Sequence, residues 1–159
     1  MPDPFDLPQR LCVAPALGPD ERTLLSGFAT ATVRRVWPGQ PGARSPWTVC
    51  PEGCCLLLSE RVGPERTALW LRFLLRELVA ARSYDARQRA EAAGLGRHRV
   101  DGRVLVAGGL RAPRLLCVAD SRVRELVLDD ELFAVEDARR GTGPAEVVDL
   151  HRPVAEESD

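Results

Sequence analysis

The chain has 159 residues, 45% of them hydrophobic, and a formal net charge of −1. This length and apolar content suit one ordinary domain with a buried core. Arginine occurs 22 times, whereas Lys, Ile and Asn are absent. Codon bias in a GC-rich genome produces that pattern, so the all-arginine basic set does not by itself predict phosphate binding.

The N-terminus lacks the charged start and continuous apolar run of a secretory signal, so we expect a cytoplasmic protein. No stretch approaches the roughly 20 consecutive apolar residues of a membrane span. The longest candidate, Ala68 to Ala81, is interrupted by Arg72, Arg76 and Glu77. Five cysteines in such a compartment should stay reduced, which argues against a disulfide framework.

The first elements are an arm and a helix. Residues 1–18 contain four prolines and little periodicity, which predicts a flexible N-terminal arm. Apolar residues then recur at helical spacing from Asp20 to Val36, and Trp37-Pro38-Gly39 ends the predicted helix.

A hairpin follows. Residues 48–50 and 54–59 read as two short strands around the turn Pro51-Glu52-Gly53. The second strand is apolar on both of its alternating faces, so we expect it in the middle of a sheet.

Gly63-Pro64-Glu65 should open a long amphipathic helix, and a short polar helix is predicted over 85–93. The apolar face of the long helix should carry Leu69, Trp70, Phe73, Leu74, Leu78 and Ala81, and its polar face Arg66, Arg72, Arg76 and Arg82.

The last elements are three strands, at about 98–106, 115–119 and 122–128, with a tight turn at Asp120-Ser121 between the last two, and they should form a meander. The predicted fold is therefore α+β, with an antiparallel sheet of four to five strands, two main helices on one face and disordered termini. The domain should span 19–137 and precede an acidic disordered tail over 138–159. We expect an interior of Leu56, Leu58, Leu69, Trp70, Phe73, Leu74, Val104, Val106, Leu116 and Val118.

Charge is distributed unevenly along the chain. Residues 1–60 carry 5 Arg and 6 acids, residues 61–124 carry 14 Arg and 6 acids, and residues 125–159 carry 3 Arg and 11 acids. The segments therefore have net charges of −1, +8 and −8, an asymmetry that can mark a surface for an acidic partner. We expect a non-enzymatic interaction or accessory protein that needs no cofactor and binds an acidic partner through Arg66, Arg72, Arg76 and Arg82. The alternative is a nucleic-acid-binding accessory protein whose acidic tail is autoinhibitory.

The cysteines offer a further alternative, a zinc-stabilised module. Cys50-x3-Cys54 has a spacing found in structural zinc sites, and further ligands could come from Cys55, Cys12, Cys117, His98 and His151. Neighbouring residues on a strand point to opposite faces, so Cys54 and Cys55 should not both reach one ion. The default expectation is therefore that these cysteines fill core or turn positions. A lone His98 beside two arginines does not predict catalysis either.

Several short motifs share a resemblance. They are Ser45-Pro46-Trp47, Gly53-Cys54-x-Leu56, Trp70-Leu71-Arg72-Phe73-Leu74-Leu75, His98-x-x-Asp101-Gly102-x-Val104 and Leu116-x-Val118-x-Asp120-x-x-Val123. Over roughly residues 19–128 the chain resembles a family of small uncharacterised proteins of high-GC actinobacteria and, more distantly, of bacteriophages. Ser59 to Gly63 and Ser121 depart from the family pattern. The resemblance implies a fold and assigns no activity.

Overall fold

The computed structural model describes residues 10–30, 37–59, 62–107 and 112–128. They form an α+β domain, as predicted, with an antiparallel sheet of six strands and helices packed on it. The elements in chain order are β1 (Arg10–Ala14), α1 (Pro19–Thr30), β2 (Trp47–Val49), β3 (Cys55–Leu58), α2 (Pro64–Phe73), the π-helix η1 (Leu74–Val79), α3 (Tyr84–Ala92), β4 (Arg99–Val106), β5 (Arg114–Ala119) and β6 (Arg122–Val127).

The strand order is β2-β3-β1-β4-β5-β6, so β1 lies inside the sheet. Leu11 is paired with Leu56 of β3 on one side and with Gly102 of β4 on the other. Beyond the strand, Leu17 is buried, and its backbone N–H donates to Gly53 O at 2.9 Å. The prediction of a flexible arm is therefore wrong for residues 10–18, because this segment joins the hairpin to the meander.

The other predicted strands and turns are confirmed. The hairpin β2–β3 and the meander β4–β5–β6 are present, and β3 is an interior strand. The compact unit that holds these elements ends at Asp129. Residues 1–9, the end of the first predicted helix at 31–36, the boundary at 137 and the tail over 138–159 lie outside the described residues.

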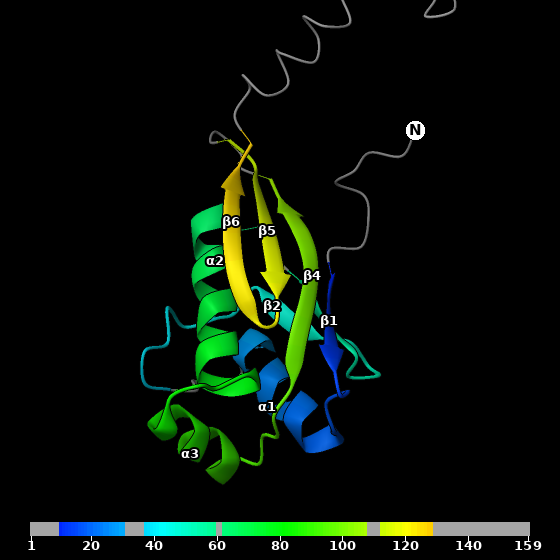
Figure 1. Cartoon of the computed structure of the whole chain (residues 1–159), viewed down its shortest axis with the longest axis vertical. Helices are drawn as coiled ribbons and strands as arrows, with labels where there is room; N and C mark the ends of the chain where they lie inside the picture. Colours follow the sequence, from blue (N-terminus) through cyan, green and yellow to red (C-terminus); the bar gives the residue numbers. More distant parts are fainter. Residues whose placement is uncertain (1–9, 31–36, 60–61, 108–111, 129–159) are drawn as a thin grey trace, which may run out of the picture. The chain divides into compact units, whose positions relative to one another are not determined.

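The sheet has one covered and one open face. Helices α1 and α2 lie behind the sheet in the view of Figure 1. Alternate strand residues point toward the helices and are buried, among them Leu11, Val13, Val100, Val104, Val106, Leu116 and Val118. Their neighbours Cys12, Arg103 and Arg124 are exposed on the other face. This alternation is the pattern of an antiparallel sheet with one face packed on a core.

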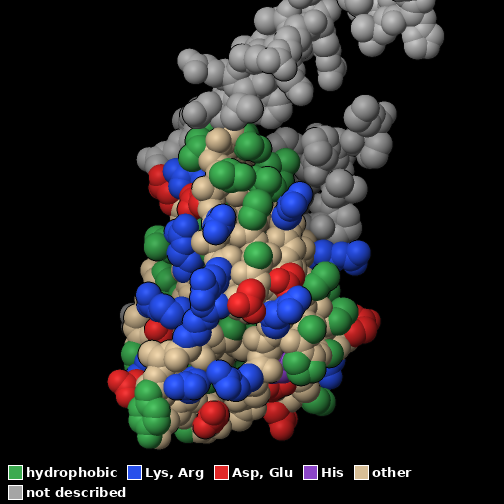
Figure 2. Space-filling view, in the orientation of Figure 1, with side chains coloured by type: hydrophobic (Ala, Val, Ile, Leu, Met, Phe, Trp, Pro, Cys, Tyr) green, Lys and Arg blue, Asp and Glu red, His purple; other side chains and the backbone are tan. Residues whose placement is uncertain are grey.

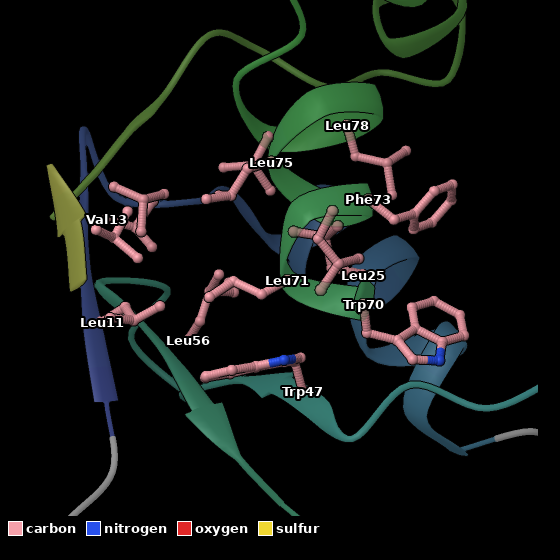
Figure 3. Close-up of a cluster of buried hydrophobic side chains, with 14 of the residues drawn as sticks. Leu11, Val13, Leu25, Trp47, Leu56, Trp70, Leu71, Phe73, Leu75 and Leu78 are labelled. Atoms are coloured by element: carbon pink, nitrogen blue, oxygen red, sulfur yellow. The ribbon is translucent and has the colours of Figure 1, made fainter. Parts of the chain in front are cut away.

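The core lies between the sheet and α2, as Figure 3 shows, with Leu11 and Leu56 pointing from the strands toward Leu71 and Leu75. Trp47 is buried, and its indole Nε1 donates to Thr67 O of α2 at 3.0 Å. An indole N–H buried in this way keeps a partner while the ring contributes apolar area. Trp47 therefore fixes the start of the hairpin to the helix.

The predicted interior is correct except at two positions. Leu69 is 55% exposed, and Leu58 is only partly buried. The buried face of the long helix instead includes Leu71, Leu75 and Val79.

The long helix begins at the N-cap Gly63 with Pro64 in its first turn, a position that suits proline. It changes to π geometry at Leu74, and Ala80 N donates to Leu75 O at 3.0 Å, five residues back. This wider turn rotates the following side chains relative to a regular α-helix. None of the helices in the described part of the chain has the length and apolar character of a membrane-spanning segment.

Candidate functional site

Arginines line two neighbouring hollows where η1 faces the turn between β5 and β6. The larger hollow, of about 320 Å³, is lined by Arg72, Leu75, Arg76, Ala80, Arg82, Ser121, Arg122 and Val123. The smaller, of about 160 Å³, is lined by Ala80, Ala81, Arg82, Arg97, His98, Arg99, Asp120 and Ser121. Because the two share Ala80, Arg82 and Ser121, we treat them as one feature, the arginine groove.

The arginine groove is strongly basic, since its lining residues include six arginines and a single carboxylate, Asp120. Figure 2 shows the basic side chains gathered on the face that β4, β5, β6 and α2 present. A concave surface with an excess of one sign of charge concentrates the electrostatic field and attracts groups of the opposite sign.

Three of the four predicted binding arginines meet in this groove. Arg72, Arg76 and Arg82 all line the larger hollow. Arg66 does not, because its guanidinium donates to Arg44 O at 3.1 Å on another part of the surface. Three of the four residues therefore lie together and Arg66 lies apart from them, and their role in binding stays a prediction.

Most of the groove arginines are oriented by neighbours. Arg72 pairs with Glu125 at 3.0 Å and Arg76 with Glu77 at 2.9 Å. Arg82 donates to the backbone oxygen of Asp120 at 2.6 Å and so links the end of η1 to the β5–β6 turn. Among the described residues, Arg97 and Arg122 have no ion-pair partner, and both are exposed.

The turn that forms one wall is fixed by its backbone. Asp120 and Ser121 have φ of 48° and 58°, the two positive values that a tight hairpin turn needs. Ser121 N donates to Val100 O at 2.9 Å, and Val100 N donates to Ser121 Oγ at 2.9 Å. Asp120 N donates to Asp101 at 2.8 Å, and that bond together with Arg99 lowers the pKa of Asp101. The wall therefore stays in place without a ligand.

A second cluster lies in the hairpin turn, where the thiols of Cys50, Cys54 and Cys55 converge. Their sulfur atoms all lie within 4.8 Å of one another. The Cys50 and Cys54 sulfurs are 3.6 Å apart, and those of Cys54 and Cys55 are 3.9 Å apart. The expectation that Cys54 and Cys55 point to opposite faces is wrong, because β3 begins only at Cys55 and Cys54 still belongs to the turn. We call the segment Cys50–Cys55 the thiol turn.

The backbone of the thiol turn is held by hydrogen bonds at both ends. Cys50 N donates to Cys55 O at 3.0 Å, and Gly53 N donates to Cys50 O at 3.0 Å. Val13 N, next to the turn, donates to Cys54 O at 2.7 Å. Pro51 and Gly53 occupy the second and fourth positions of the inner turn, which proline and glycine favour. The positions of the three thiols are therefore set by the backbone.

The three thiols differ in acidity. Burial alone would raise the pKa of Cys50, but hydrogen bonds from Cys55 and Cys54 lower it below its ordinary value. Burial raises the pKa of Cys55 to about 12, and the neighbouring Cys50 and Cys54 add to the effect. In such a coupled group the protons leave in steps.

His98 belongs to neither a catalytic pair nor the thiol turn. Its Nδ1 lies 2.7 Å from Pro15 O, and its Nε2 lies 2.8 Å from Glu21 Oε1. Both ring nitrogens are therefore engaged by oxygen atoms of α1 and of the segment before it. Glu21 also accepts from Gly18 N and Gly96 N, each at 2.6 Å. This network ties α1 to the start of β4.

Comparisons with protein-family models, with curated proteins and with solved structures find no match. The resemblance to small actinobacterial proteins stays a prediction that rests on the motifs given above.

Several residues of these sites were missed from the sequence. Arg97, Arg99 and Arg122 belong to the groove because strand pairing brings the ends of β4 and β6 beside η1. The sequence placed Asp120-Ser121 in a tight turn but gave no signal that this turn faces the long helix. Cys55 was not missed but was expected not to share an ion with Cys54, and it joins the thiol cluster because the strand starts one residue later than predicted.

Proposed function

We propose that this protein is a non-enzymatic interaction protein that binds an acidic partner through the arginine groove. The observation that carries the proposal is the convergence of Arg72, Arg76, Arg82 and Arg122 on one hollow of about 320 Å³. The guanidinium group presents several N–H donors in a fixed planar fork that matches a carboxylate or a phosphate.

The character of the lining favours an acidic protein segment over a nucleic acid. Leu75, Ala80 and Val123 add apolar surface beside the arginines, which suits the stem of an acidic side chain. Among the described residues that line the groove there is no Trp, Tyr or Phe on which a base could stack. Base stacking is a main source of affinity in proteins that bind single strands.

The polar groups in the groove also suit binding more than catalysis. The Ser121 hydroxyl accepts a hydrogen bond from Val100 N, and His98 is engaged at both ring nitrogens. A general base must be within hydrogen-bond reach of the proton it removes and free to accept it. His98 does not offer that arrangement, whereas the exposed guanidinium groups are accessible to an anion.

The acidic C-terminal part of the chain would act as an internal competitor. Residues 125–159 carry a net charge of −8, opposite in sign to residues 61–124. Removal of residues 137–159 should therefore tighten the binding of an external acidic segment.

The test is fluorescence anisotropy with a labelled oligo-glutamate peptide and, in parallel, a labelled single-stranded oligonucleotide. The double variant Arg82→Glu/Arg122→Glu should weaken peptide binding at least tenfold, about 1.4 kcal/mol. Arg66→Glu makes a matched control, because it reverses an exposed arginine outside the groove. The wild-type affinity should fall steeply as salt is added.

Three outcomes would contradict the proposal. The first is an equal loss in the Arg66→Glu control, and the second is salt-independent binding. The third is tighter binding of the oligonucleotide than of the peptide, which would favour the nucleic-acid alternative.

A further inference from the structure

The thiol turn has a geometry that the arginine groove does not explain. Three thiols converge there, two of them buried (Cys50 and Cys55) and one exposed (Cys54). Thiols whose sole role is to fill a core need not bring their sulfur atoms together. We propose that Cys50, Cys54 and Cys55 bind one Zn²⁺ ion as three thiolate ligands, with the fourth coordination position open to solvent.

Two of the three sulfur separations fit one tetrahedral ion, and the third, between Cys50 and Cys55, is within 4.8 Å. Two sulfurs that each lie about 2.3 Å from a tetrahedral Zn²⁺ are about 3.8 Å apart. The observed separations of 3.6 Å and 3.9 Å lie on either side of that value. Soft thiolate ligands select Zn²⁺ and Cu⁺ over hard cations such as Mg²⁺ or Ca²⁺.

The site is held in place before an ion binds. Hydrogen bonds from Val13 N to Cys54 O and from Leu17 N to Gly53 O fix the thiol turn against β1 and the residues that follow it. A Cβ at Gly53 would lie 2.3 Å from Leu17 O, so the turn is in close contact with that backbone. An ion therefore meets thiols whose backbone is already ordered, which lowers the entropy cost of binding.

The open position follows from the ligand count. In the described part of the chain, no His, Asp, Glu or further Cys joins the three thiols within ligand distance. His98, which the sequence suggested as a ligand, is bonded to Glu21 and Pro15. Exposure of Cys54 shows that the cluster reaches the surface, where water or a donor from another molecule can complete a tetrahedron. Three protein ligands with one open position is the arrangement of zinc sites that exchange their fourth ligand.

The experiment is a metal titration of the full chain, purified under reducing conditions. Zn²⁺ affinity is measured by competition with a colorimetric chelator, and Co²⁺ is used as a spectroscopic substitute. We expect one ion per chain and, with Co²⁺, sulfur-to-metal charge transfer together with the visible bands of a tetrahedral ion. No uptake of Zn²⁺, or a stoichiometry other than one ion per chain, would overturn the assignment.

The deciding variants are Cys54→Ser and Cys12→Ser, because both residues are exposed and either change should leave the fold intact. Cys54→Ser should weaken Zn²⁺ binding at least about tenfold, since even loss of a group that only orients a ligand costs that much. Cys12→Ser should leave affinity unchanged, and so should Cys117→Ser. Equal affinities for the Cys54→Ser and wild-type proteins would exclude the site, as would a matching loss in Cys117→Ser. A loss in Cys12→Ser, whose backbone pairs with Cys55, would contradict the open fourth position. Failure of this titration would leave the arginine groove proposal intact, because the two sites share no residue.

Discussion

The thiol turn and the arginine groove are built in opposite ways. In the thiol turn, backbone hydrogen bonds to Val13 and Leu17 fix three short side chains within a few ångströms of one another. In the arginine groove, long exposed side chains extend from η1 and the strand ends, and several of them form ion pairs at the surface.

Because of this difference, the two sites should owe their binding specificity to different features. The thiol turn should depend on atomic placement, so one added methyl group can disrupt it. The arginine groove should depend on summed charge, so no single arginine is needed for the fold. Substitutions can separate these two behaviours.

The largest effect is expected for Gly53→Ala. Gly53 has φ of +75°, and an added Cβ would lie 2.3 Å from Leu17 O. Strain at a positive φ and a backbone clash should together lower the free energy of unfolding by about 3 kcal/mol or more. Urea denaturation followed by circular dichroism measures this loss, and Zn²⁺ affinity should fall with it.

Gly94→Ala is the matched control, because Gly94 also has a positive φ, +83°, but an added Cβ meets nothing within 4 Å. Gly94→Ala should lower the free energy of unfolding by about 1 kcal/mol, which is the contribution of backbone strain at a positive φ alone. Equal losses in the two variants would mean that close packing against Leu17 does not hold the thiol turn.

The second-largest effect on stability is expected for Glu21→Gln, which alters the hydrogen-bond network between α1 and the start of β4. Burial alone would raise the pKa of Glu21, but bonds from Gly96 N, His98 and Gly18 N lower it below its ordinary value of 4.5. Loss of charge-assisted hydrogen bonds should reduce the free energy of unfolding by about 2 kcal/mol near neutral pH.

The contribution of Glu21 to the free energy of unfolding should decrease in acid. Because the pKa of Glu21 is lower in the folded protein than in the unfolded chain, its contribution is complete above about pH 4.5. It is lost as the pH falls through the lower folded value. The stability difference between wild type and Glu21→Gln should therefore shrink in acid, and a constant difference from pH 7 to pH 3 would contradict the role of the carboxylate.

The smallest effect on stability is expected in the groove itself. Arg122→Ala and Arg76→Ala should each change the free energy of unfolding by less than about 0.5 kcal/mol, because exposed charges contribute little to folding. Thermal denaturation of the two variants checks this. A large loss in either would mean that the arginines hold the fold together, and it would remove the contrast with the thiol turn.

Local patterns were sufficient to predict most of the fold. Alternation from Val100 to Val106 identified β4, and the Asp120-Ser121 turn identified the hairpin that follows it. These signals lie within one or two elements, so they depend on neighbours in sequence. The six-stranded sheet differs from the predicted four to five strands mainly because β1 was not recognised.

The wrong predictions share a physical cause, because the structure of these segments depends on residues that are distant in the sequence. The β1 segment has only Leu11 and Val13 as a buried alternation among prolines, and pairing with β3 and β4 decides its state. The predicted apolar face of the long helix is centred too close to Leu69 and too far from the residues that are buried. The π turn that begins at Leu74 is not evident in the sequence either. The site residues from the strand ends could be found only once the sheet order was known.

The interior place of β1 has a consequence for how the protein is made. Leu11 is paired with Gly102, about ninety residues later in the chain. During synthesis β1 must therefore wait for about ninety further residues before its edge toward β4 is paired. Until then no strand connects the hairpin to the meander. The unpaired backbone groups of the nascent chain could pair instead with another extended segment of suitable apolar alternation.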